Sequence, residues 1–239
     1  NKRILNFGTP RNDFLVQNRS NTELQSKLKE KYARLIGFNP TKKLIAYMPT
    51  WRGADGAIFC FYRLPREAQQ EIRAILDASN AVLIEKHHIH TYELFPSPAQ
   101  SLCSTVVQGN AMSSIDTQEL LLATDILITD YSSVFIDYGL LKRPIIHFAY
   151  DLAGFEKNSA GAIEDFREIA GGPIVETEAD LKAAIANVLS RPTFSPGIKH
   201  PSMTIYETGR ACEQLFEFIR NKNDHLIRYE QIKYLHEGE

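Results

Sequence analysis

The chain has 239 residues, 44% of them hydrophobic, which is enough to bury a sizeable core as one large domain or as one domain with appendages. Its 27 Lys and Arg residues nearly balance 29 Asp and Glu residues, so no global positive charge favours nucleic acid, and an anion site has to be local. The three cysteines are scattered without a C-x-x-C pair, which argues against zinc or redox chemistry and favours a reducing cytoplasm, and no apolar run approaches the roughly 20 residues of a membrane span.

Short apolar segments alternate with segments whose apolar residues recur every three or four positions. In chain order, strands are predicted at 4–7, 44–48, 81–85, 105–107, 125–129, 145–149 and, more weakly, 173–175. Helices are predicted at 23–35, 65–78, 117–123, 132–141, 178–189 and 210–220. The alternation predicts an α/β fold with a doubly wound parallel sheet and helices on both faces. Segments 96–102 and 155–172 fit neither pattern.

The two ends of the chain carry their own signals. A strand is predicted almost at once, at 4–7, without an initiating methionine or a signal peptide, so we expect the chain to be a fragment excised from a longer protein. After Asn221 the sequence is rich in Lys, Glu and Tyr, which fits either a helix that crosses to another domain or a solvated tail.

Polar residues follow most of the predicted strands. In a sheet of this type, ligands bind outside the carboxyl ends of the strands, so these residues are the candidate site. The segments concerned are 8–13, 49–52, 86–88, 109–110 and 130–133. Four of the five carry a cation, a hydroxyl or both, a composition that suits a phosphorylated ligand.

The segment 130–133 reads Asp-Tyr-Ser-Ser and lies between a buried strand and a helix. Ser132 and Ser133 can cap that helix, and the unpaired N–H groups of its first turn would favour an anion. A simple helix cap and a phosphate site are both compatible with this pattern. Asp130 is better suited to a ribose or glycerol hydroxyl, or to a nearby histidine, than to phosphate.

The run Lys86-His87-His88-Ile89-His90 raises the question of a metal site. In an extended strand His88 and His90 face one side while His87 points away, and no Cys or carboxylate cluster completes a tetrahedral set in the sequence. We therefore predict no metal. His87 is expected to be a packed or surface residue.

Several motifs in a fixed order resemble one family. The run T-D-Y-S-S-V-x-x-D-Y-x-x-L-K-R-P, followed by F-A-Y-D and preceded by Y-M-P-T-W-R and G-x-P-R-N-D, resembles the CDP-glycerol glycerophosphotransferases of teichoic acid and capsule synthesis. The resemblance spans residues 8–175. It implies the Rossmann-like, C-terminal half of a GT-B fold, in which residues 1–205 bind a CDP-polyol donor and 206–239 form a helical extension.

The resemblance also implies roles for individual residues. A basic residue, one variable residue and a histidine map onto Lys86 and His88, so His88 is the candidate catalytic residue, donating a hydrogen bond or proton to phosphate as CMP leaves. Arg52 is expected either to pair with phosphate or to form a salt bridge with a loop carboxylate. The full set of expected donor-binding residues is Arg11, Pro49, Thr50, Arg52, Lys86, Asp130, Tyr131, Ser132 and Ser133.

Other polar residues have simpler interpretations. Trp51 is expected to pack as a large apolar body, and Asp13 to cap the short helix that follows it. Lys142 and Arg143 end a helix, where cations complement the dipole, and are left out of the site. His147, inside an apolar strand, is expected to be a hydrogen-bonded core residue.

The implied reaction transfers glycerol phosphate, or a related polyol phosphate, from CDP-glycerol or CDP-ribitol to a polymer or lipid-linked acceptor. The family's W-H-G-T-P segment, whose histidine is its expected base, has no counterpart here, so this chain alone should bind donor but turn over poorly. No cofactor and no nucleic acid partner is expected, and the full protein would work in the cytoplasm, peripheral to the inner membrane face. Two alternatives remain: a GT-B glycosyltransferase that uses a nucleotide sugar, and a non-catalytic module that binds an anionic polymer or membrane.

Overall fold

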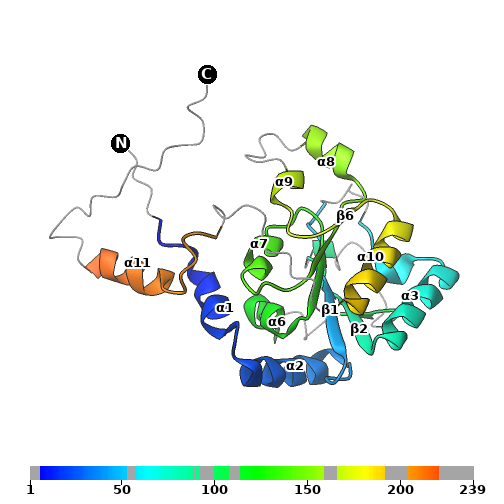
Figure 1. The fold of residues 1–239 in the computed structure, drawn as a ribbon, viewed down its shortest axis with the longest axis horizontal. Coiled ribbons are helices and arrows are strands. Elements are labelled where there is room, and N and C mark those ends of the chain that lie inside the picture. Colours follow the sequence, from blue (N-terminus) through cyan, green and yellow to red (C-terminus); the bar gives the residue numbers. More distant parts are fainter. Residues whose placement is uncertain are drawn as a thin grey trace.

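A six-stranded parallel sheet forms the centre of the molecule (Figure 1). The computed structural model describes residues 6–52, 58–88, 90–91, 100–107, 114–158, 166–191 and 204–220. The strand order is β3-β2-β1-β4-β5-β6, so the chain builds one half of the sheet outward from β1 and then returns to build the other. The strands are β1 (Lys43–Tyr47), β2 (Ala81–Glu85), β3 (Thr105–Val106), β4 (Ile126–Thr129), β5 (Ile145–Phe148) and β6 (Ile174–Val175).

The central strands are mostly apolar and almost wholly buried because helices cover both faces of the sheet. Every residue of β4 and of β5 is buried, and in β1 only Lys43 is exposed. Such continuous burial is typical of parallel strands in α/β proteins. The predicted doubly wound fold is therefore confirmed.

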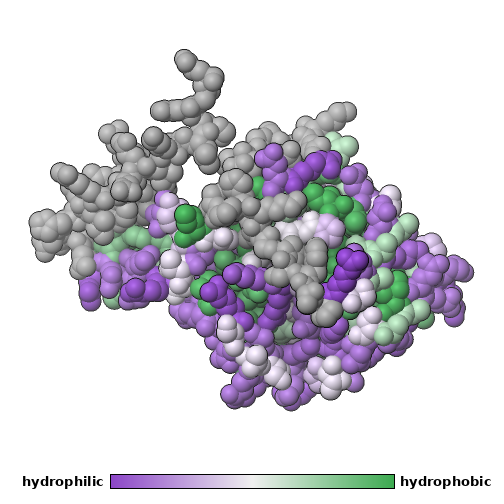
Figure 2. Space-filling view, viewed as in Figure 1, coloured by the Kyte–Doolittle hydropathy of each residue, from purple (hydrophilic) through white to green (hydrophobic). Residues whose placement is uncertain are grey.

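Two hydrophobic clusters lie on opposite faces of this sheet. One packs α1 (Asp13–Asn18), α2 (Thr22–Ile36), α6 (Thr117–Ala123) and α7 (Val134–Gly139). The other packs α3 (Arg66–Ala78) and α10 (Glu178–Ser190). In Figure 1 these two groups lie on either side of the sheet, and Figure 2 shows hydrophilic side chains over α2, at the bottom of the molecule.

The predicted elements agree closely with the observed ones. The bounds of β2 and α6 are those predicted, β1 is shifted by one residue at both ends, and β3 to β6 differ by one residue at one end. Helix α7 is shorter than the predicted 132–141. The predicted strand at 4–7 is wrong where it can be checked, because Asn6 and Phe7 have no strand structure, while residues 4–5 lie outside the described part.

Segments without a clear sequence pattern form short elements. These are the 3₁₀ helices η1 (Pro10–Asn12) and η2 (Phe61–Arg63), and the helices α8 (Leu152–Asn158) and α9 (Phe166–Ile169). Segment 155–172 thus contains the end of α8 and all of α9. Most of 96–102 lies outside the described residues, but Gln100 bridges to Thr105.

Helix α11 (Ala211–Arg220) is tied to the beginning of the chain by Asp13. The Asp13 carboxylate accepts hydrogen bonds from the backbone N–H of Ala211 at 2.8 Å and of Cys212 at 2.7 Å. The expectation that Asp13 caps the helix next to it is therefore wrong: Asp13 is the first residue of α1 and caps a helix 198 residues away. Whether residues 206–239 form a separate extension stays a prediction.

None of the described helices is both long enough and apolar enough to span a bilayer.

Candidate functional site

The direction of chain progression across the sheet reverses between β1 and β4. Ligands of doubly wound folds bind in the crevice at this switch point, outside the carboxyl ends of the strands. Strand β1 pairs with β2 on one side and with β4 on the other, with Tyr47 opposite both Glu85 and Ile128. The residues that follow these three strands therefore lie in a row along one edge of the sheet.

Asp130, directly after β4, organises the centre of this edge. Its carboxylate is fully buried and accepts hydrogen bonds from the Thr50 backbone N–H at 2.9 Å, the Thr50 hydroxyl at 2.7 Å and the Ser132 N–H at 3.1 Å. Its backbone carbonyl lies 3.0 Å from Nδ1 of His147. Asp130 thus ties the ends of β1 and β4 together, and these contacts with protein take up the carboxylate that we expected to bind a ligand hydroxyl.

Arg52 completes the neutralisation of Asp130. One of its terminal nitrogens lies 2.6 Å from the Asp130 carboxylate, and its Nε and other terminal nitrogen form a two-point contact with Asp151 at 2.7 and 3.0 Å. The Arg52 side chain is 10% exposed. Of the two roles considered for Arg52, the structure shows the salt bridge. Arg52 pairs with the loop carboxylate of Asp151 and also with the buried carboxylate of Asp130.

Aromatic rings enclose the Arg52 guanidinium. Its central carbon lies 5.4 Å from the Tyr131 ring centroid and 5.3 Å from that of Tyr150, distances typical of cation–π contacts. The Tyr131 hydroxyl donates to Asp151 at 3.0 Å, and its ring stacks on Phe155 at 3.9 Å. Burial alone would raise the pKa of Asp151, but its hydrogen bonds and charge interaction with Arg52 lower it.

Asp151 was not among the predicted site residues. The signal was present, because Asp151 ends the F-A-Y-D motif directly after β5, at the same edge of the sheet. In the structure its role is to hold Arg52.

The two serines lie at the start of α7 but do not cap it as predicted. Ser133 is the N-cap residue, and its side chain makes no capping hydrogen bond. The Ser132 hydroxyl reaches the Val134 N–H at 3.5 Å, which is too long for a strong bond. Ser133 is exposed and Ser132 is partly exposed, so both hydroxyls are accessible from outside the protein.

Lys86 and His88 follow β2 on the other side of β1. Lys86 is partly buried, makes no ion pair among the described residues, and has its pKa lowered by burial. His88 is exposed, with its ring 5.6 Å from that of Trp51 and 5.0 Å from that of His90. Trp51 therefore does more than fill space, because it brings the end of β1 against the imidazole of His88. Pro49 and Trp51, like Thr50, are partly exposed.

Arg11, in η1, contacts the side of α7. Its guanidinium pairs with Asp137 at 2.9 and 3.2 Å, which raises the pKa of Arg11 through a hydrogen bond and opposite charge. The Arg11 side chain is 55% exposed, whereas that of Asp137 is 8% exposed. Of the two predicted arginines, Arg11 is thus the one whose charge can reach a ligand.

The residues left out of the site have structural contacts. Arg143 donates to the carbonyls of Leu122 and Thr124 at 2.8 and 2.5 Å. His147 is fully buried and hydrogen-bonded, as expected of a core histidine. Gly109 and Asn110, the other candidate strand end, lie outside the described residues.

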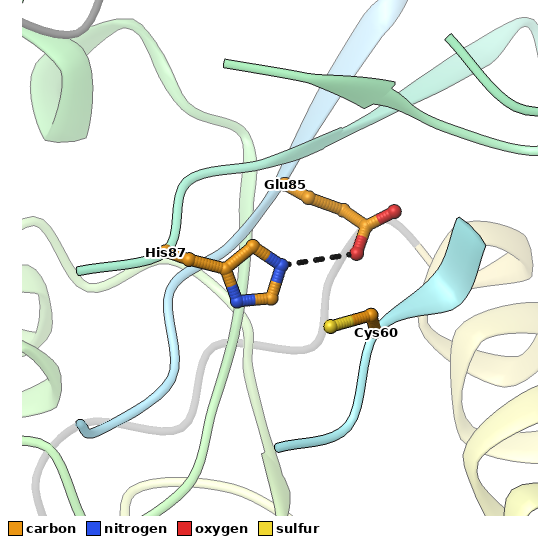
Figure 3. A group of neighbouring side chains, drawn as sticks. All are labelled: Cys60, Glu85 and His87. Atoms are coloured by element: carbon orange, nitrogen blue, oxygen red, sulfur yellow. Dashed lines mark hydrogen bonds and ion pairs between the residues drawn. The ribbon is translucent and has the colours of Figure 1, made fainter. Parts of the chain in front are cut away.

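One group of possible metal ligands occurs in the described ranges. Ligand atoms of Cys60, Glu85 and His87 all lie within 4.8 Å of one another, and all three residues are buried (Figure 3). We expected no Cys or carboxylate cluster to complete a tetrahedral set. The fold brings Cys60 to Glu85 and His87 through a contact that the sequence does not show, which gives three possible ligands.

The sheet topology defines an α/β, Rossmann-like domain with polar residues at its switch point. Residues 1–221 match the family described as CDP-glycerol:poly(glycerophosphate) glycerophosphotransferase. The chain belongs to this family.

Relatives with assigned names support the same assignment. The chain is 32% identical over 187 residues to the teichoic acid glycerol-phosphate transferase of Staphylococcus aureus (strain NCTC 8325 / PS 47), covering 78% of this chain and 45% of that protein. It is 30% identical over 225 residues to the teichoic acid poly(glycerol phosphate) polymerase of Bacillus subtilis (strain 168), covering 92% of this chain and 29% of that protein. The chain thus spans less than half the length of these relatives.

A solved structure shares the fold. A histidine-to-asparagine variant of the wall teichoic acid polymerase TagF superposes with a TM-score of 0.69 at 27% identity, covering 92% of this chain and 52% of that one. A TagF crystal soaked with CDP-glycerol matches with a TM-score of 0.64.

Proposed function

We propose that this chain is the donor-binding half of an enzyme that transfers glycerol phosphate from CDP-glycerol to a teichoic acid or capsule polymer. An acceptor hydroxyl would attack the β-phosphorus of the donor, forming a new phosphodiester, and CMP would leave with the electron pair of the broken P–O bond. Family membership and the TagF crystals soaked with CDP-glycerol support this choice of donor.

The observation that carries the proposal is the row of accessible groups at the switch point. The Ser132 and Ser133 hydroxyls follow β4, and Lys86 and His88 follow β2, so the groups come from the strands on both sides of β1. Arg11 adds an exposed guanidinium beside α7. Cations and hydroxyl donors at the carboxyl edge of a parallel sheet suit a diphosphate.

Lys86 and His88 would act at different stages of the transfer. The ammonium of Lys86 would neutralise donor phosphate charge, and its partial burial strengthens that attraction relative to a solvated cation. His88 would donate a hydrogen bond or a proton to the phosphate oxygen that leaves with CMP. In the full protein, His88→Gln should lower kcat by about 10²-fold or more, the usual contribution of general acid catalysis.

The acceptor would be bound by the part of the enzyme that this chain does not include. The chain covers 45% of the S. aureus transferase and 52% of the TagF chain. We place the full protein in the cytoplasm, with peripheral contact at the inner membrane face, where a lipid-linked acceptor would be accessible.

Calorimetric titration of the folded chain with CDP-glycerol, CDP-ribitol, CMP and a UDP-sugar tests the donor assignment. We expect CDP-glycerol and CMP to bind and the UDP-sugar to bind at least about tenfold more weakly, a difference of about 1.4 kcal/mol. Preference for the UDP-sugar would support the glycosyltransferase alternative. Binding of polyglycerol phosphate or anionic vesicles that CMP does not displace would support the non-catalytic alternative.

CDP-ribitol is a second candidate donor. The chain is 25% identical over 194 residues to the teichoic acid ribitol-phosphate polymerase of S. aureus (strain NCTC 8325 / PS 47), compared with 32% for the glycerol-phosphate transferase of the same strain. The higher identity favours glycerol. The titration above separates the two donors directly.

A further inference from the structure

The residues after β2 alternate between the protein interior and the site edge. Glu85 and His87 are 0% and 1% exposed, whereas Lys86 is partly exposed and His88 is exposed. This is the alternation of an extended backbone, in which successive side chains point to opposite sides. Whatever fixes Glu85 and His87 therefore also fixes the direction of Lys86 and His88.

Glu85 is held by donors from three parts of the chain. Its Oε2 accepts from the Phe61 N–H at 2.9 Å and lies 3.2 Å from Nε2 of His87, and its Oε1 accepts from the Tyr62 N–H at 3.1 Å and from the Ser104 hydroxyl. Each oxygen thus has two partners, which satisfies a buried carboxylate completely. The carboxylate joins β2 to η2 and to the segment before β3.

His87 is enclosed by groups from β1, β2 and the segment around η2. The Tyr47 ring lies at 5.6 Å and the Tyr62 ring at 6.4 Å, both nearly perpendicular to the imidazole, and the Cys60 sulfur is close by. Burial alone would lower the pKa of His87, but its contacts with Cys60 and Glu85 outweigh burial and raise it to about 9. With Nε2 of His87 3.2 Å from the Glu85 carboxylate, we expect the imidazole to be cationic near neutral pH and to form a buried ion pair with Glu85.

We propose that Glu85 and His87 are positioning residues, whose buried ion pair holds the strand end so that Lys86 and His88 face the donor phosphates. This inference rests on the donor-binding function proposed above. The pair touches no ligand itself. The ion pair contributes rigidity. If the Lys86 ammonium and the His88 imidazole already have their binding positions in the free chain, they lose less conformational freedom when the donor binds.

The same three side chains have the composition of a partial zinc site, and Figure 3 shows why the ion pair is the better account. The dashed contact between Glu85 and His87 occupies Nε2 of the imidazole and one oxygen of the carboxylate. The remaining capacity of the carboxylate is used by the Phe61 and Tyr62 N–H groups and the Ser104 hydroxyl. A metal would have to displace these contacts.

Histidine ¹⁵N spectra of the ligand-free chain test the ion pair without depending on donor binding. We expect His87 to carry protons on both ring nitrogens at pH 7.5, and His88 to give one sharp signal. In His87→Phe, which keeps an aromatic ring of similar size, the His88 signal should broaden or split. A neutral His87 at pH 7.5, or an unchanged His88 signal in the variant, would overturn the inference.

A double-mutant cycle then tests the route of action by calorimetry with CMP. His87→Phe should weaken binding about tenfold, and should cost little more in a chain that already carries Lys86→Met, because both changes disable the same group. Full additivity would show that His87 acts only through general stability. Tyr138→Phe is the matched control: it removes a buried hydrogen bond to Thr124, before β4 at the opposite edge of the sheet, and should leave CMP affinity unchanged.

Two outcomes separate this inference from the proposed function. If no nucleotide binds to the folded wild-type chain, the donor proposal fails, and the ¹⁵N spectra still decide whether the ion pair orders His88. If the chain binds one equivalent of Zn²⁺, and Cys60→Ser abolishes that binding, the cluster is a metal site and the ion-pair account is wrong.

Discussion

Both donor groups of Thr50, its backbone N–H and its hydroxyl, point at the carboxylate of Asp130, 80 residues further along the chain. This contact joins the ends of β1 and β4 at the point where the sheet changes direction. Because Asp130 is fully buried, its charge depends on these donors and on Arg52. The centre of the candidate site is thus a preformed framework of ion pairs, around which the accessible groups are arranged.

Thr50→Val should destabilise the chain, because it removes one hydroxyl donor from a buried carboxylate while keeping the shape of the side chain. We expect a loss of about 1 to 3 kcal/mol in the free energy of unfolding, measured by urea denaturation. Thr41→Val is the control, since the Thr41 hydroxyl bonds Asn39 at an exposed position and should change stability by less than about 0.5 kcal/mol. Equal effects of the two changes would contradict the role given to Asp130.

Arg52→Met should be among the most damaging changes at this edge. It would leave Asp130 buried without its cation and release Asp151, and breaking a buried pair in this way typically costs about 3 to 5 kcal/mol. Arg11→Met removes a pair whose arginine is 55% exposed and should cost about 1 kcal/mol or less.

The two arginine variants should also differ in how they affect donor binding. Arg11→Met should weaken donor binding with little loss of stability, whereas Arg52→Met should mainly reduce stability. A folded Arg11→Met chain should bind CDP-glycerol more weakly than wild type, whereas its melting temperature should hardly change. A large stability loss for Arg11→Met, or none for Arg52→Met, would reverse the roles that the geometry gives them.

The stability of the chain should fall as the pH rises from about 6.5 to 9, through the contribution of His87. Its folded-state pKa of about 9 lies above the ordinary value of 6.5, so the stabilisation is fully present below pH 6.5 and is lost as the pH rises through 9. Lys86 has its pKa lowered by burial and contributes with the opposite sign at higher pH.

The difference in unfolding free energy between wild type and His87→Phe, followed by urea denaturation from pH 6 to 10, isolates the histidine. That difference should shrink with rising pH, because groups common to both proteins cancel. A difference that stays constant across this range would show that His87 is not charged in the folded chain.

Asp13→Ala should loosen α11 from the body of the protein. The change removes both hydrogen bonds to the first turn of that helix, a loss of about 0.5 to 2 kcal/mol for a capping residue. Hydrogen exchange at the Ala211 and Cys212 amides should quicken. In the control Thr177→Ala, which removes the cap of α10, exchange should quicken at Asp180 and stay unchanged in α11.

The sheet could be predicted from the sequence because its signals are local. Strand β2 is a compact apolar run between a helix and a polar segment. The first polar residues after such a run mark the end of the strand. The strand ends also predicted which residues share one edge of the sheet, since Thr50, Lys86 and Ser132 all lie there.

The partners of the charged side chains could not be predicted, because they depend on contacts between distant segments. The sequence is equally compatible with Arg52 binding phosphate and with Arg52 forming a salt bridge. Only the fold shows that Asp130 and Asp151 are its partners. The sequence leaves His87 as a packed or a surface residue, and only the fold shows that it is buried beside Cys60 and Glu85. Such long-range pairs leave no periodic pattern in one sequence.

The most direct test of the central claim is calorimetric titration of CDP-glycerol into the wild-type chain and into Lys86→Met and Lys42→Met. Lys42 pairs with Asp77 just before β1, at the opposite edge of the sheet from Lys86, so it is a control for loss of a lysine. We predict that the wild type and Lys42→Met bind CDP-glycerol equally well and that Lys86→Met binds it about tenfold or more weakly. Failure of the folded wild-type chain to bind, or equal affinity in all three proteins, would contradict a donor site at the carboxyl edge of the sheet.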